Sequence, residues 1–353
     1  MLLKLCGVSS CISIQMSSKP AQQQVRNLTV ERFISALHKV GLRPEPIKKQ
    51  VEVPSPITGT KRKRDSSEFY VTKLMDYTIH DDEDREEWRK WRKEQRLPSA
   101  SMVSSYFGNG YRSLNVELKD IVGTLEDKPI DPFVQKMMDH GNDNELHAKN
   151  AYMTQTPDRW GIEWIANGNM SYIFEVEHNE KKSNILATPD MVIVMPETPE
   201  MATHTRVVEI KCPTYGILMK KKPLRDVVDD FNTMYPHGKP GHFLQAATYA
   251  LLFNCKYFDL FYYFTDTINY EWVKISYELK QETKEAIFNA LHYCTMYIEK
   301  VSTLPEGTSH SPVKRPPGKT TGIDLARDSY LEKVVYYADP EDLQEEASDE
   351  SEE

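Results

Sequence analysis

Short apolar runs bounded by Pro, Gly, Asn or Asp residues predict β-strands across the middle of the chain. These strands cover residues 170–178, 185–195, 206–212, 257–265 and 269–277. Polar turns separate the first two strands and the last two, so each of these pairs is expected to form a β-hairpin. A Pro-rich loop separates the second strand from the third.

Apolar residues spaced three or four apart predict helices between and after these strands. We expect helices in the charged segment 81–96, around residues 141–152, from Gly241 to Asn254 and over residues 287–301. Strands that alternate with helices are typical of α/β domains. The pattern therefore predicts a central mixed β-sheet flanked by helices.

The pattern changes at both ends of the chain. Residues 1–67 contain one amphipathic segment, 25–41, which predicts a short helix, followed by a Pro-rich basic linker. After residue 304 the Pro, Gly and Lys content rises, and the acidic end predicts a flexible tail over residues 305–353. The 353 residues therefore predict one folded domain, 68–304, between two tails.

Charge is concentrated in short segments. The net charge of −9 arises from residues 339–353, which hold nine Asp or Glu residues and no Lys or Arg. A local basic groove for nucleic acid is therefore compatible with the overall acidity. The run Lys61–Arg64 in the linker predicts a nuclear import signal, with a solvated basic linker as the alternative.

Cysteine content and hydropathy indicate the compartment. Five cysteines without a C-x-x-C pair favour a reduced intracellular protein that lacks structural zinc and iron–sulfur clusters. The apolar run within residues 1–16 is too short to span a membrane, and it lacks a signal-peptide cleavage region. We therefore expect no association with membranes.

Three charged residues mark the strands 185–195 and 206–212. Asp190 precedes the apolar run 191–195, and Glu209 and Lys211 lie two residues apart in the next strand. Residues two apart in a strand share one face, so the Glu209 carboxylate and the Lys211 ammonium are expected side by side. The neighbouring strand adds the Asp190 carboxylate to this group.

Carboxylates without nearby His or Cys ligands suit Mg²⁺ or Mn²⁺ rather than Zn²⁺. A divalent ion with a neighbouring lysine can activate water and stabilise charge on a phosphoryl group, so the trio suggests phosphodiester hydrolysis. The spacing alone is weak. By itself it favours a sheet with a rim Asp and a surface Glu–Lys pair.

The flanking sequence makes the pattern specific. TPDMVIV followed by VVEIKCP resembles the PD-(D/E)xK nuclease core of the lambda-exonuclease or YqaJ-type viral recombinase family. Upstream, Gly141, Glu145, Ala148 and Tyr152 are similar to the family's G-x₃-E-x₂-A-x₃-Y helix. Downstream, Gln245 matches the family's Gln-containing helix, although Ala occupies the position of the usual second Gln. The resemblance covers roughly residues 86–298.

The resemblance implies a restriction-endonuclease-like α/β core and a metal-dependent site. It implies that Asp190 and Glu209 bind Mg²⁺, or Mn²⁺ as a substitute, and that the Ile210 carbonyl is a further ligand. Glu145 would support a second ion or a bound water. Lys211 would activate or position the attacking water. Gln245 would position that water or the scissile phosphate.

The family's W-x₃-R motif and its T-A-S-like turn are matched by Trp88, Arg92 and residues 99–101, with an interval about two residues longer than usual. The resemblance implies that Arg92 and Ser101 hold a terminal 5′-phosphate, which a guanidinium and a hydroxyl can bind. The alternative is a charged helix anchored by its tryptophans. The basic run Lys220, Lys221 and Lys222 predicts a phosphate-tracking groove, or else a solvated loop.

The expected function is an exonuclease that resects duplex DNA with free ends in the 5′→3′ direction. The resemblance implies recombination or viral genome processing, a single-strand-annealing partner, a trimeric homo-oligomer and, with the basic run, the host nucleus. One alternative is an endonuclease or RNA-degrading nuclease of the same fold. Another is a nonenzymatic DNA-binding protein, which would have no need for crowded charges at a strand.

Overall fold

The structure is a computed structural model, and it describes residues 68–79, 84–123, 130–155, 162–196, 202–213, 222–266, 269–304 and 320–338. All of these residues fall within one compact unit. The predicted helix 25–41, the basic run 61–64 and the acidic end 339–353 lie outside the described residues. Lys220 and Lys221 also lie outside them.

The described residues form the predicted strands and helices together with several that the sequence pattern does not predict. The strands are β1 (Tyr70–Thr78), β2 (Glu163–Ala166), β3 (Met170–His178), β4 (Lys181–Ala187), β5 (Met191–Met195), β6 (His204–Lys211), β7 (Tyr257–Thr265), β8 (Tyr270–Glu278) and β9 (Tyr330–Tyr336). The helices are α3 (Asp84–Gln95), α4 (Ala100–Tyr106), α5 (Leu114–Ile121), α6 (Pro132–Thr154), α8 (Leu224–Met234), α9 (Pro240–Leu252), α10 (Gln281–Ser302) and α11 (Gly322–Ser329).

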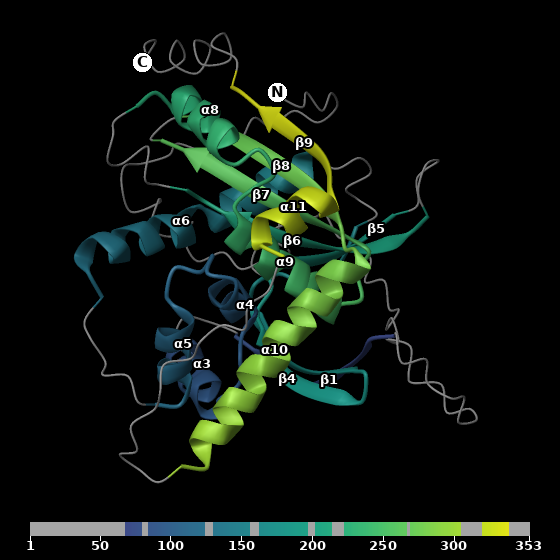
Figure 1. The fold of residues 1–353 in the computed structure, drawn as a ribbon. Helices are drawn as coiled ribbons and strands as arrows, with labels where there is room; N and C mark the ends of the chain where they lie inside the picture. The colour runs from purple at the N-terminus through teal and green to yellow at the C-terminus, as the bar shows by residue number, and fades with distance from the viewer. Residues whose placement is uncertain are drawn as a thin grey trace, which may run out of the picture. The chain divides into compact units, whose positions relative to one another are not determined.

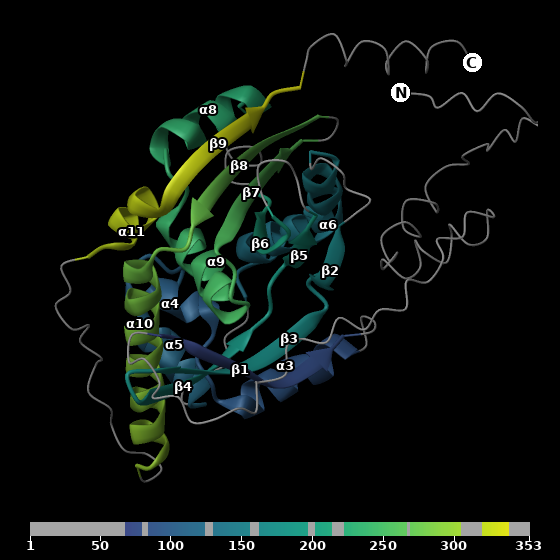
Figure 2. The same cartoon turned by 90° about the vertical axis from the view of Figure 1, so that its right-hand side faces the viewer.

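The larger sheet has the strand order β2-β5-β6-β7-β8-β9; strands β5 to β9 are labelled in Figure 1, and β2 is labelled in Figure 2. Strands β6 and β7 pair in parallel, and the other neighbours pair antiparallel. A parallel pair needs a long crossover, which α8 and α9 supply here. The predicted mixed sheet flanked by helices is confirmed.

Helices cover both faces of this sheet (Figure 2). The apolar α9 packs with Val207, Leu260 and Tyr262 in the main core. On the other face, the second half of α6 packs with Val208 and Ile210. Because side chains alternate between the two faces of β6, its residues pack into two different hydrophobic cores, one on each face of the sheet.

A second sheet joins β1, β3 and β4 in the order β1-β3-β4, and all of its pairs are antiparallel. The predicted first hairpin is present, with a tighter turn than expected. Asn179 and Glu180 have φ values of 50° and 63°, as a two-residue hairpin turn of the mirror-image type requires.

The predicted strand 185–195 is wrong as one continuous element. Strand β4 ends at Ala187 in the small sheet, and β5 begins at Met191 in the large sheet. Pro189 lies in the break, where its missing N–H and fixed φ prevent a continuous ladder. Asp190 therefore lies where the chain passes from one sheet to the other.

The domain also extends beyond the predicted boundary. After residue 304, Thr321 and Asp324 form a capping box that begins α11, and β9 then pairs with β8 at the edge of the sheet. Leu325 and Ala326 are buried. The prediction of a flexible tail from residue 305 is therefore wrong for residues 320–338.

None of the described helices combines the length and the apolar character that crossing a membrane requires.

Candidate active site

Asp190, Glu209 and Lys211 come together at the end of β6 and the start of β5. The backbone N–H of Ile210 donates to Asp190 Oδ2 at 2.8 Å. The Lys211 Nζ donates to Glu209 Oε1 at 2.5 Å. The spacing of two residues in a strand thus places the carboxylate and the ammonium on one face, as predicted.

Glu209 is fully buried, at 0% exposure. Its Oε1 is held by Lys211, whereas Oε2 is buried without a hydrogen-bond partner among the described residues. A buried carboxylate oxygen without a partner is costly, because it has lost water and gained nothing in return. The fold therefore leaves one ligand atom of Glu209 available.

Burial raises the pKa of Glu209 to about 8, and the neighbouring Asp190 carboxylate adds to this effect. Burial likewise raises the pKa of Asp190, with a further contribution from Glu145 that Lys211 opposes. Burial alone would lower the pKa of Lys211, but Glu209 and Asp190 outweigh it and keep the pKa above its usual range. Lys211 therefore holds a proton and acts as a cation.

Glu145 lies on α6 and is bound by a second lysine. The Lys149 Nζ contacts Glu145 Oε1 at 2.6 Å and donates to the Asn167 carbonyl at 2.6 Å. Gly168 adopts φ +88°, and a Cβ there would approach Lys149 Nζ to 2.9 Å and Glu145 Oε1 to 3.0 Å. The Gly168 turn therefore packs directly against this ion pair, and the Glu145 and Lys149 charges both act on Asp190.

Gln245 and Tyr249 lie on α9, one helical turn apart. The Gln245 Nε2 donates to the Tyr249 hydroxyl at 3.4 Å. Burial raises the pKa of Tyr249, and the Glu209 charge adds to this effect. The α9 residues thus reach the carboxylate cluster from the main-core side of the sheet, opposite to α6.

The donor set fits a divalent ion that keeps several waters. No group of three His, Cys, Asp or Glu side chains in the described ranges is arranged to hold a metal. Mg²⁺, however, is commonly bound through one or two carboxylates plus waters and substrate phosphates. Asp190 and the unpartnered Glu209 Oε2 supply that number, whereas the Glu145 carboxylate is engaged by Lys149.

The contacts shown for the candidate phosphate-binding residues are with residues outside this cluster. Arg92 on α3 places its guanidinium 5.5 Å from the centroid of the Trp88 ring. Ser101 on α4 is exposed, and its hydroxyl lies 2.8 Å from that of Ser99. Lys222 contacts Asp230 at 2.5 Å, so its charge is already paired.

Helix α3 is nevertheless tied to the turn before Asp190. The Trp88 indole N–H donates to the Ser171 hydroxyl at 2.7 Å, and this hydroxyl lies 2.7 Å from that of Thr188. Thr188 begins the TPD sequence at the break between the two sheets. The W-x₃-R helix therefore supports the loop that presents Asp190.

Sequence reasoning missed Lys149 and Gly168. Lys149 is four residues after Glu145 on one face of α6, and this spacing is a signal for an ion pair. Gly168 lies in the short turn between β2 and β3, and only its neighbours in space reveal its role. Neither residue belongs to the motifs that carry the resemblance.

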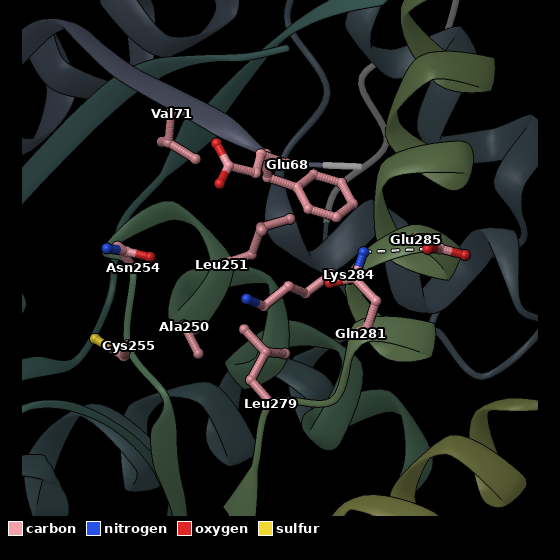
Figure 3. A pocket seen from close by; sticks show the side chains of 11 residues that line it. Glu68, Val71, Ala250, Leu251, Asn254, Cys255, Leu279, Gln281, Lys284 and Glu285 are labelled. Carbon is pink, nitrogen blue, oxygen red and sulfur yellow. Dashed lines mark hydrogen bonds between the residues drawn. The ribbon is translucent and has the colours of Figure 1, made fainter. Parts of the chain in front are cut away.

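A cavity of about 610 Å³ lies where the start of β1, the end of α9 and the start of α10 meet (Figure 3). Leu251, Asn254 and Leu279 line it, and Lys284 extends among them. The residues of the carboxylate cluster do not contribute to its lining. This cavity is therefore separate from the candidate active site.

A mixed sheet that presents an Asp, a buried Glu and a Lys at adjacent strand ends is the arrangement that the PD-(D/E)xK pattern predicts. Residues 87–237 match the model of the YqaJ-like viral recombinase domain, which confirms the resemblance. This match indicates a lambda-exonuclease-like DNA nuclease. Comparison with curated protein sequences gave no match.

Solved structures give similar chains. The chain is 16% identical to LHK-Exo in complex with dAMP, with a TM-score of 0.40, over 61% of this chain and 94% of that chain. A second structure of this alkaline exonuclease from Laribacter hongkongensis gives 19% identity, a TM-score of 0.37, and coverage of 61% and 95%. A phage-related exonuclease from Haemophilus somnus 129PT is 13% identical, with a TM-score of 0.35, over 58% of this chain and 94% of that chain.

Proposed function

We propose that this protein is a Mg²⁺-dependent DNA exonuclease that resects the 5′ strand of duplex ends. The observation that carries the proposal is the cluster of Asp190, Glu209 and Lys211, in which the buried Glu209 Oε2 has no partner. A purely structural Glu–Lys pair would not need a second buried carboxylate beside it, because like charges raise each other's pKa. Mn²⁺ is the expected substitute for Mg²⁺.

Asp190 and Glu209 would hold the ion, together with the Ile210 carbonyl. When bound, the ion supplies Lewis-acid chemistry at the phosphodiester. The Ile210 N–H orients Asp190 through Oδ2, so the direction of the carboxylate is fixed before substrate arrives. The protonated Lys211 places a positive charge where negative charge develops on the phosphoryl group, and it can orient the attacking water by donating to it.

Glu145 and Gln245 have supporting roles in this proposal. Lys149 holds Glu145 at the α6 side of the cluster, where its carboxylate can accept from a bound water. Gln245 approaches from α9 and can donate its amide N–H to a phosphate oxygen or to the water. Holding the reacting groups in place in this way accounts for a large share of such catalysis.

Direction and biological role complete the proposal. Arg92 and Ser101 would bind the terminal 5′-phosphate, and Lys220, Lys221 and Lys222 would follow the backbone of the strand. The family resemblance supports a role in recombination or viral genome processing, as a homo-oligomer with a single-strand-annealing partner. The run Lys61–Arg64 supports a location in the host nucleus.

The test is digestion of end-labelled linear duplex DNA, closed circular DNA and single-stranded RNA in Mg²⁺ or EDTA. Wild-type protein is expected to degrade only the linear DNA, only in Mg²⁺, and Lys211→Ala should abolish this activity. Lys182→Ala is the matched control, because Lys182 also pairs with a glutamate, Glu175 at 2.7 Å, but lies on the small sheet. Cleavage of circles or RNA would favour the alternative nuclease functions, and inactivity on every substrate would favour a DNA-binding protein.

A further inference from the structure

The loop between α4 and α5, residues 107–113, is fixed on the N-terminal end of α9. The Ser104 Oγ on α4 donates to the Gly241 carbonyl at 2.5 Å, and the Asn109 N–H donates to the Ser104 carbonyl at 2.8 Å. A Cβ on Gly241 would approach the Asn109 carbonyl oxygen to 2.4 Å, so only glycine permits this close approach. These contacts set the position of the loop on α9.

Tyr111 in this loop is held by its hydroxyl and leaves its ring open. It is 88% exposed, yet its hydroxyl lies 2.9 Å from Nε2 of His242, which is buried at the start of α9. Among the described residues, only the His242 ring contacts that of Tyr111, and it is tilted by 38° with the centroids 6.1 Å apart. The faces of the Tyr111 ring are therefore available for stacking.

His242 connects Tyr111 to the strand pair that carries the candidate active site. Its Nδ1 lies 3.3 Å from the Tyr262 hydroxyl. Tyr262 pairs with Lys211 across β6 and β7, and residues directly opposite in a sheet share a face. Burial lowers the pKa of His242 well below its usual value, and the charges of Lys211 and Lys239 add to this effect. The neutral ring can donate through one nitrogen and accept through the other.

This chain of hydrogen bonds lies on the sheet face that presents Glu209 and Lys211. These two residues alternate with the residues of β6 that face α6, so their side chains face α9 instead. The Lys211 and Glu209 charges both act on the Tyr262 hydroxyl, as does Tyr111. Tyr111 is therefore linked through two hydrogen bonds to the side chain that lies beside Lys211.

Lys239 adds a cation at the same end of α9. Its backbone N–H donates to the Tyr262 hydroxyl at 3.1 Å, and its charge acts on the His242 ring. The half-buried ammonium lies 5.2 Å from the centroid of the Tyr235 ring, and no carboxylate in the described part of the chain pairs with it. Burial lowers the pKa of Lys239, because the ammonium has lost water. A phosphate is a partner that would compensate such a cation.

We propose that Tyr111 stacks on a base of the strand bound at the candidate active site, and that Lys239 contacts a phosphate of the same strand. We call these two residues the base subsite. This inference rests on the proposed nuclease function, because the subsite adjoins that site. A flat ring stacks on any base, so the subsite would tolerate every sequence, as an enzyme that degrades a strand nucleotide by nucleotide requires. The hydrogen bond to His242 would keep the ring in place while successive bases pass it.

The test of stacking compares two labelled single strands of equal length and charge, one with bases and one abasic. Their affinities are measured by fluorescence anisotropy in EDTA, which removes the metal ion that cleavage would need. Tyr111→Leu should weaken binding of the strand with bases about tenfold and leave that of the abasic strand unchanged, because only a base can stack on the ring. Tyr111→Phe should keep most of the affinity, since it retains the ring. Equal losses for the two strands, or no loss for either, overturn the stacking proposal.

Tyr270→Leu is the matched control. Tyr270 is 43% exposed, but its ring stacks on Tyr263, which packs on the α6 face of the sheet. This variant should bind both strands as the wild-type protein does, and circular dichroism checks that each variant is folded.

The phosphate contact is tested by the salt dependence of binding. Lys239→Gln should reduce the slope of log affinity against log salt concentration by about 0.7, the value for one phosphate contact on a single strand. Lys182→Gln is the control, because Lys182 pairs with Glu175 on the small sheet, and it should leave the slope unchanged. An unchanged slope in Lys239→Gln overturns the phosphate contact.

The nuclease assay separates the two proposals. If the wild-type protein digests linear duplex DNA in Mg²⁺ but binds neither single strand, or shows none of these losses in the variants, the base subsite alone fails. If the wild-type protein neither digests nor binds DNA, both proposals fail.

Discussion

Glu209 combines burial, a lysine partner and an unpartnered oxygen, so the metal binding that we propose would depend on pH. A metal ligand must be deprotonated, so a proton on the carboxylate competes with the ion. Because the pKa of Glu209 is raised to about 8, this competition extends well above the usual range of a glutamate. The direction is fixed: the metal-free site holds the proton below that value and releases it above.

We therefore expect the apparent affinity for Mg²⁺ to rise with pH, by up to about tenfold per unit, and to level off above about pH 8. Titration calorimetry at several pH values measures it. Glu209→Gln should bind Mg²⁺ weakly and lose this pH dependence, whereas Glu175→Gln on the small sheet should keep it. A wild-type affinity that is flat across this pH range contradicts the prediction.

Gly168 offers a test of the ion pair between Glu145 and Lys149. In Gly168→Ala, the new Cβ would meet both side chains and would also require the positive φ that L residues avoid. We expect a loss of about 1–2 kcal/mol in the free energy of unfolding and a severalfold loss of nuclease activity. Denaturant unfolding and the linear-DNA assay measure these effects.

Gly123→Ala is the control, because Gly123 has φ +76° but no neighbour within 4 Å of a Cβ. It should lose less stability, because only the backbone strain applies, and keep its activity. Equal activity in the two variants would mean that the Glu145 pair does not affect the reaction.

The charged trio was predictable from sequence because its geometry is local. Glu209 and Lys211 share a face because side chains alternate along a single strand. Asp190 joins them through the pairing of β5 with β6, which are consecutive strands in the sequence. The places of Lys149 and Gly168 were not predictable from sequence, because they lie close to Asp190 only where α6 packs against the β2–β3 turn. Contacts of this kind depend on how helices and sheets pack, and no short motif records them.

At the scale of elements, the break at Pro189 is the main departure from the sequence pattern. The apolar character continues from β4 into β5, so hydrophobicity alone predicts one strand. The proline interrupts the ladder, and the chain changes sheets within three residues. The Asp190 carboxylate at that junction accepts from the Ile210 N–H, and Thr188 in the preceding turn hydrogen-bonds to Ser171.

Trp88 tests this support from outside the cluster. Trp88→Phe keeps an aromatic ring but removes the hydrogen bond to Ser171, so we expect a loss of about 1 kcal/mol in stability. Asp190 should then be less well fixed, with activity reduced severalfold. Thermal unfolding and the nuclease assay provide the measurements. Trp91→Phe on the same helix is the control, since the Trp91 ring stacks on Tyr77 instead. Comparable losses of activity in both variants would rule out a specific role for Trp88.

At the scale of the molecule, the folded unit is larger than the apolar pattern suggests. Strand β9 was not predicted because its partner β8 lies more than fifty residues earlier and its two faces are only partly buried. In residues 86–298, by contrast, the sequence predicted the order of the strands and helices that form the core. A family signature thus locates the centre of the fold, and edge elements depend on long-range pairing.

Truncation separates the two parts of the C-terminal region. A chain that ends at Ala338 keeps α11 and β9, so we expect its thermal unfolding to match that of the full chain. A chain that ends at Leu304 loses the buried Leu325 and Ala326 and exposes an edge of β8, which should cost about 3–5 kcal/mol and promote aggregation. Unchanged unfolding of the shorter chain, measured by calorimetry and light scattering, would mean that β9 contributes nothing to the fold.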